Sequence, residues 1–216
     1  MYYFVDEKEY HIYKVDCSNT LKKTCELLKK KNIIAQFVLV GSGARNMVTR
    51  NGNGPYDLDY NLIIVKAPDE YWNDLRKLKD TIRNALNKAV GGNWFSDAQD
   101  STSCLTALLH FSDSPKVKFS FDVAIICENS NGKWMRLIHN KNLWGIGNDQ
   151  YTWNEVPYSM NIKVKADVLK RNDLWQEVRD KYLNLKNMYL CRMDRSHTSF
   201  TVYVEALNQV HNKYFR

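Results

Sequence analysis

Residues 37–65 read FVLVGSGARNMVTRNGNGPYDLDYNLIIV and place two aspartates inside an otherwise apolar segment. Asp57 and Asp59 are one residue apart, so on a β-strand both side chains lie on one face, while Leu58 and Tyr60 lie on the other. Two neighbouring carboxylates repel each other when both are ionised, and magnesium, which prefers oxygen ligands, relieves that repulsion. The pattern therefore predicts a metal-binding strand rather than one aspartate in a turn and another on the surface.

A glycine-rich turn precedes these aspartates. Gly41, Ser42 and Gly43 follow an apolar run that ends at Val40. Where such a turn opens a helix, its free backbone N–H groups and a hydroxyl can hold phosphate. The alternative is a plain connection between a strand and a helix. Arg45, just beyond the turn, is either an additional positive charge for the phosphate or a surface arginine.

A third carboxylate lies in a later apolar segment, at Asp122. On a strand, Phe121 and Val123 face the core, while Ser120 and Ala124 flank Asp122 on the other face. These two small neighbours leave room for a ligand beside the carboxylate. The alternative is an exposed aspartate on an edge strand.

Together these residues resemble the nucleotidyltransferases of the DNA polymerase β superfamily, in particular the minimal and antibiotic-modifying branch. That family has an apolar strand, a Gly-Ser turn, Asp-x-Asp in the next strand and a later single aspartate. The resemblance covers about residues 18–127. Two features depart from it: the connection from Ser42 to Asp57 is longer than usual, and Asn46-Met47 stands where those branches often have Gly-Thr.

The resemblance implies a mechanism and a fold. Two magnesium ions would be held by Asp57 and Asp59, one of them also by Asp122, which would help to activate the acceptor hydroxyl. The resemblance also implies a phosphate-binding group: Gly41, Ser42, Gly43 and Arg45. The enzyme would move a nucleoside monophosphate from a triphosphate such as ATP to a small molecule, a protein side chain or another nucleotide. The implied fold is α+β, a small mixed or antiparallel sheet with flanking helices.

The spacing of apolar residues predicts the remaining elements. We expect strands at residues 33–40, 57–65, 103–111 and 116–127, and helices at about 18–31, with Ser18 or Asn19 as the cap, and at 68–90. Residues 128–157 are not assigned to elements. Two apolar stripes at residues 168–189 and 200–214 predict a C-terminal helical hairpin. We expect a nucleotidyltransferase core at residues 1–160 and the hairpin, packed on that core, at residues 161–216.

Composition narrows the class of protein. No stretch approaches the roughly 18 apolar residues of a membrane helix, and the first residues lack the pattern of a secretory signal. Five cysteines without a close pair fit free thiols in a reducing cytoplasm, and no zinc-ligand spacing is present. We therefore expect a cytoplasmic protein that does not enter a membrane.

The net charge of +7 raises the question of nucleic acid. The basic residues are spread along the chain, so a polynucleotide groove is not favoured, although an RNA-binding module stays an alternative. A second alternative is a non-catalytic domain that binds a nucleotide or a protein, for example in a toxin–antitoxin pair. Four aromatic residues belong either to the core or to a base-stacking platform: Trp134, Trp144, Tyr151 and Trp153. We interpret residues 144–147, Trp-Gly-Ile-Gly, as a loop. The C-terminal stripes pack on the sheet or on a second subunit, which leaves a homodimer open.

Overall fold

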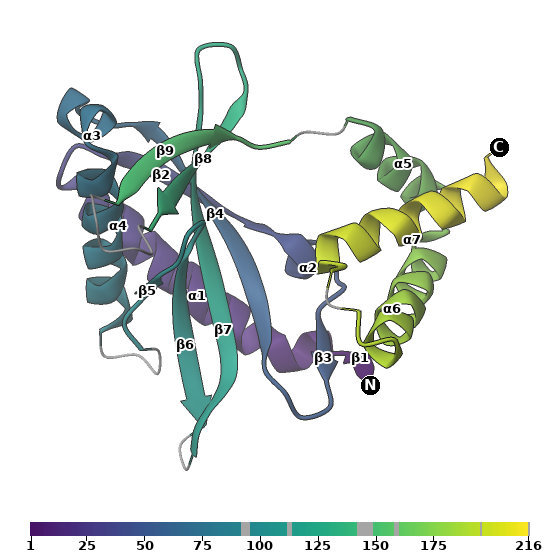
Figure 1. Cartoon of the computed structure of the whole chain (residues 1–216). Coiled ribbons are helices and arrows are strands. Elements are labelled where there is room, and N and C mark those ends of the chain that lie inside the picture. The colour runs from purple at the N-terminus through teal and green to yellow at the C-terminus, as the bar shows by residue number, and fades with distance from the viewer. Residues whose placement is uncertain (92–95, 112–113, 142–148, 158–159, 195, 216) are drawn as a thin grey trace. The chain divides into compact units, whose positions relative to one another are not determined.

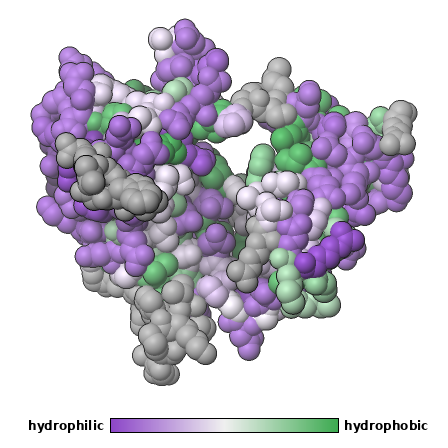
Figure 2. All heavy atoms as spheres, viewed as in Figure 1, coloured by the Kyte–Doolittle hydropathy of each residue, from purple (hydrophilic) through white to green (hydrophobic). Residues whose placement is uncertain are grey.

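The structure, a computed structural model, describes residues 1–91, 96–111, 114–141, 149–157, 160–194 and 196–215. The chain divides into two compact units (Figure 1). Unit 1 contains residues 1–5, 46–54 and 157–216, and unit 2 contains residues 6–45 and 55–156. The face seen in Figure 2 is mainly hydrophilic, with separate apolar patches.

Unit 2 is built on a seven-stranded mixed sheet. Its main path runs β2-β4-β7-β6-β5, and β8 and β9 extend it from the end of β7. The pairing of β4 with β7 is parallel, and the other pairings are antiparallel. The strands are β2 (Ile34–Val40), β4 (Tyr56–Lys66), β5 (Gln99–Asp100), β6 (Leu105–Phe111), β7 (Ser114–Glu128), β8 (Trp134–Asn140) and β9 (Gln150–Glu155). This confirms the predicted α+β class with a mixed sheet.

Helices cover one face of this sheet (Figure 1). They are α1 (Glu7–Lys29) and α4 (Leu75–Val90). Unit 2 also contains two short helices, α2 (Gly41–Ala44) and α3 (Asp69–Asn73). Tyr13 of α1 stacks on Phe119 of β7, with ring centroids 4.8 Å apart. The helix-side residues Leu58 and Phe121 are fully buried. The core of unit 2 therefore lies between these helices and the sheet, and polar side chains of the strands are directed to the opposite face.

The first helix begins earlier than the sequence predicts. Asp6 caps α1 by accepting a hydrogen bond from the Lys8 N–H at 2.8 Å, and acidic residues in the first turn suit the helix dipole. The prediction that Ser18 or Asn19 is the cap was wrong. Ser18 lies inside the helix, where its hydroxyl donates a hydrogen bond to the Lys14 carbonyl at 2.8 Å. Its hydroxyl is therefore paired without capping a helix end. The predicted helix at residues 68–90 is likewise interrupted at Asp74, which has extended backbone and caps α4.

Unit 1 combines a small sheet with three helices. Strands β1 (Tyr2–Phe4) and β3 (Thr49–Asn51) pair antiparallel. The helices are α5 (Met160–Arg171), α6 (Trp175–Cys191) and α7 (Ser199–Tyr214), and the last two form the C-terminal hairpin. The predicted first stripe is split between α5 and α6 because Asp173 adopts a left-handed conformation, with φ 57°. The predicted domain boundary after residue 160 stays a prediction.

Two further expectations concern residues 128–157 and membrane insertion. The unassigned segment contains the β8–β9 hairpin, while the predicted loop at residues 144–147 lies outside the described residues. Among the helices that the structure describes, none has the length and apolar character needed to cross a membrane.

Candidate active site

The side chains of β4 alternate as the sequence predicts. Leu58 and Tyr60 are buried on the helix side, with 0% and 2% of their surface exposed. On the opposite face Asp57 is exposed and Asp59 is half-buried. The two carboxylates therefore share the face that the helices leave uncovered.

The parallel pairing of β4 with β7 brings in the third carboxylate. Asp122 is in register with Asp59, and Ser120 is in register with Asp57. Asp57, Asp59 and Asp122 each offer an oxygen, and these oxygens lie within 4.8 Å of one another. Three carboxylate oxygens at this spacing suit a hard divalent cation such as magnesium. The residues present therefore fit the metal that the resemblance implies.

The electrostatics of the cluster point the same way. Burial first, and then the charges of Asp57 and Asp122, raise the pKa of Asp59 to about 6, although Arg45 and Arg136 act in the opposite sense. The ionised form of Asp59 is thus disfavoured, by burial first and by its acidic neighbours second. A bound cation would remove the repulsion and favour the ionised form of Asp59.

Thr106 of β6 holds the third carboxylate, a contact that sequence reasoning missed. It is in register with Asp122 and donates its hydroxyl hydrogen bond to Asp122 Oδ1 at 2.5 Å. Cys104 Sγ lies 3.7 Å from the Thr106 hydroxyl oxygen. The bond fixes the orientation of the carboxylate and engages one of its two oxygens. The sequence contains only a weak indication of this contact, namely that Thr106 is a polar residue between the buried Leu105 and Ala107.

Gly41 is required by its neighbour Asp59. Val40, the last residue of β2, is in register with Asp59, and Gly41 follows it with φ 63°. A Cβ atom at Gly41 would lie 2.1 Å from Asp59 Oδ2, far inside contact distance. A side chain at Gly41 would therefore collide with a carboxylate of the cluster.

The other residues of the predicted phosphate group lie at the same turn. Ser42 and Gly43 belong to α2, and the Arg45 N–H donates to the Ser42 carbonyl at 3.2 Å. Gly43 is packed inward, since a Cβ there would lie 2.7 Å from Leu58 Cδ2. Gly41 and Arg45 are thus the residues of this turn that lie near Asp59, whereas Gly43 packs on the helix side of the sheet. The contact of the turn with phosphate stays a prediction.

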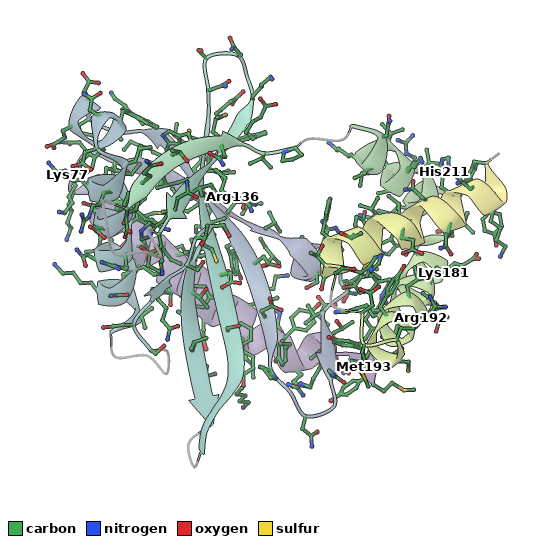
Figure 3. The ribbon with its side chains drawn as sticks, viewed as in Figure 1. Lys77, Arg136, Lys181, Arg192, Met193 and His211 are labelled. Atoms are coloured by element: carbon green, nitrogen blue, oxygen red, sulfur yellow. The ribbon has the colours of Figure 1, made fainter. Side chains whose placement is uncertain are left out.

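Arg136 is a second residue that the sequence did not indicate (Figure 3). It lies on β8 in register with Ile126, which alternation places on the same face as Asp122. Its Nε is buried and, in the described part of the chain, has no hydrogen-bond partner. The positive charge of the guanidinium lowers the pKa of Asp59. Since Arg136 forms no ion pair with the residues that the structure describes, its guanidinium is available to an anionic ligand.

Neither a family model nor a curated protein matches the chain. Solved structures do. The chain matches GTP-bound DncV of Vibrio cholerae with a TM-score of 0.54 and 12% identity, over 83% of this chain and 45% of that one. The chain has the nucleotidyltransferase fold. CdnC of E. coli MS115-1 with ATP gives a TM-score of 0.55 and 16% identity, over 94% of this chain and 61% of that one. These proteins are nucleotidyltransferases of the DNA polymerase β superfamily, so the resemblance seen in the sequence is confirmed for the fold.

A third match is V. cholerae DncV, a cyclic AMP-GMP synthase, in complex with the linear intermediate 5′ pppA(3′,5′)pG. Its TM-score is 0.55 at 13% identity, over 83% of this chain and 45% of that one. The chain therefore spans about half the length of the DncV structures that it matches. At this identity the similarity establishes the nucleotidyltransferase fold, and the activity has to be argued from the site.

Proposed function

We propose that the protein is a magnesium-dependent nucleotidyltransferase that moves a nucleoside monophosphate from a triphosphate to an acceptor hydroxyl and releases pyrophosphate. The observation that carries this proposal is the convergence of Asp57, Asp59 and Asp122 within 4.8 Å on a nucleotidyltransferase fold. The glycine turn beside Asp59 and the GTP- and ATP-bound states of the similar structures support it.

Each residue of the site has a role in this proposal. Asp57 and Asp59 would hold two magnesium ions, and Asp122 would share one of them. When bound, such a pair stabilises the attacking and leaving oxygens of an in-line displacement. Asp122, whose carboxylate accepts a hydrogen bond from the Thr106 hydroxyl, would position the acceptor hydroxyl and take its proton.

The phosphates of the donor would be held at the turn after β2. The backbone N–H groups of Gly41 and Gly43 and the Ser42 hydroxyl are the donors that we assign to the β- and γ-phosphates. Arg45 and Arg136 both place positive charge near Asp59. These charges would favour a polyanionic substrate over a cationic one.

The acceptor that we favour is a second nucleotide. The sequence left it open between a small molecule, a protein side chain and a nucleotide. The linear dinucleotide intermediate in the DncV complex is a product of transfer to a nucleotide hydroxyl, and that protein shares the fold of this chain. This support is by analogy of fold, so the acceptor must be tested directly.

The test is a transfer assay with triphosphates labelled at the α-phosphate. Each common ribonucleoside triphosphate is incubated with the protein and magnesium, alone, with a second nucleotide, or with an aminoglycoside or a protein acceptor. We expect pyrophosphate release and a labelled nucleotide product, neither of which Asp57→Asn should form. Tight triphosphate binding with no transfer to any acceptor would favour the non-catalytic binding domain instead.

A further inference from the structure

The outer edge of β2 is open to another strand. β2 forms one end of the main sheet and pairs only with β4 among the described strands. In the described part of the chain, no further backbone hydrogen bond to β2 is present outside that pairing. A strand in this position presents a row of backbone N–H and C=O groups that a second strand can pair with.

The side chains of β2 do not protect this edge. The strand reads Ile-Ala-Gln-Phe-Val-Leu-Val, without a charge or a proline. None of its seven residues is buried, and Ile34 and Val38 are 38% and 44% exposed. Natural proteins commonly guard an edge with charged residues, proline or a very short strand. β2 has only a register irregularity, between Ile34 and Ala35 at its start.

Other outer strands of the same sheet are guarded. β5 is only two residues long, which leaves little edge for a further strand. β9 ends in Glu155, which forms an ion pair of 2.9 Å with Lys133. β2 therefore differs from the other outer strands of its sheet: its edge is not protected, which indicates that it pairs with a further strand.

We infer that β2 pairs antiparallel with β2 of a second copy of this chain, about a two-fold axis at Phe37. This register places Gln36 opposite Val38 of the other copy, and Ala35 opposite Leu39. Ala35 then faces the larger Leu39, Phe37 faces the Phe37 of the other copy, and no charges meet. Such an interface uses the same surface on both copies, as in most homodimers.

Charge favours a second copy over a different partner. β2 offers no charged group that would select a charged peptide. The net charge of +7 lies mainly on unit 1, since acidic and basic residues nearly balance in unit 2. Two copies that meet at unit 2 therefore repel each other little. The pairing is independent of the proposed transfer reaction.

The register is tested by placing charges at Gln36 and Val38, which are both exposed. In Gln36→Lys/Val38→Lys the two introduced lysines face each other twice across the axis. In Gln36→Glu/Val38→Lys an acid faces a lysine at both places. Val65→Lys is the control, because Val65 is 56% exposed but lies on β4. Sedimentation velocity over a concentration series measures the dissociation constant of the dimer, and circular dichroism verifies folding.

We expect the wild type, the Val65→Lys control and the Glu/Lys variant to form dimers. The Lys/Lys variant should dissociate at least about tenfold more readily, because like charges directly opposite each other destabilise a strand pair. A wild type that stays monomeric at every concentration would overturn the inference. Equal dissociation of the two double variants would overturn the proposed register, and with it the pairing argued here.

Discussion

Replacing Gly41 with alanine tests the geometry of the carboxylate cluster with a single methyl group. The new Cβ would lie 2.1 Å from Asp59 Oδ2 and 2.9 Å from its Cγ, where ordinary contacts begin at 3.4 Å. The carboxylate must therefore retreat by about 1 Å or more, and a misplacement of about 1 Å can cost on the order of a hundredfold in rate. We expect the transfer rate of Gly41→Ala to fall by at least that factor.

The same substitution also strains the backbone, and this effect must be separated. Gly41 has φ 63°, and a left-handed conformation costs alanine about 1–2 kcal/mol. Gly52 provides a matched control: its φ is 52°, and a Cβ there meets no atom within 4 Å. Gly52→Ala should lose similar stability in thermal unfolding but keep its activity.

The assay is single-turnover transfer from a labelled triphosphate with magnesium in excess. Manganese binding, followed by electron paramagnetic resonance, provides a second readout that needs no acceptor. We expect Gly41→Ala to bind manganese more weakly than Gly52→Ala does. If the two variants bind manganese equally well and turn over equally fast, the close approach of Gly41 to Asp59 does not shape the site, and the reasoning is refuted.

Further predictions concern the carboxylates and their partners. Asp57→Asn should lower transfer by about a thousandfold through lost charge stabilisation, whereas near-normal rates would remove Asp57 from the site. Thr106→Val should raise the magnesium concentration for half-maximal transfer by about tenfold, and Thr106→Ser should restore it; a purely structural role would leave this concentration unchanged. The raised pKa of Asp59, about 6, means that the metal-free fold gains stability from this group at low pH and loses it as pH rises toward and through 6. Asp59→Asn should therefore melt above the wild type at about pH 7.5 without metal, and the difference should shrink toward about pH 5; a constant difference would contradict this. Finally, duplex RNA should bind only weakly near physiological salt, whereas tight binding that falls steeply with added salt would support the RNA-binding alternative.

The carboxylate cluster could be predicted from the sequence because it depends on local alternation. Asp57 and Asp59 share a face of any strand that contains both, and Asp122 needed only a second strand with small polar-side neighbours. The glycine turn was visible for the same reason, as a break after an apolar run. What alternation cannot provide is register between distant strands. The pairing of β6 with β7 brings Thr106 to Asp122, and the pairing of β7 with β8 brings Arg136 to the same face.

The structure also differs from the sequence prediction where long-range packing decides between alternative local structures. Ser18 is a good helix cap by residue type, yet Asp6 lies upstream and the intervening residues are helical. Residues 1–5 and 46–54 cluster with the C-terminal helices in unit 1, through contacts between segments far apart in the chain. No periodicity in a short segment records such long-range pairing. Site residues on one strand, such as Asp57 and Asp59, can therefore be predicted from the sequence. Site residues that distant strands contribute, such as Thr106 and Arg136, cannot.

The carboxylate cluster constrains few positions of the sequence. The cluster requires two aspartates on β4, one on β7 in parallel register, and a glycine where Asp59 approaches the backbone. Most other strand positions on the helix side, such as Leu58 and Phe121, must only be apolar and of suitable volume, and cores tolerate many such exchanges. A chain under these constraints can keep a TM-score of 0.54 to DncV at 12% identity. Thr106 and Arg136 lie outside this minimal set, and their substitution tests what they add to the chemistry of the cluster.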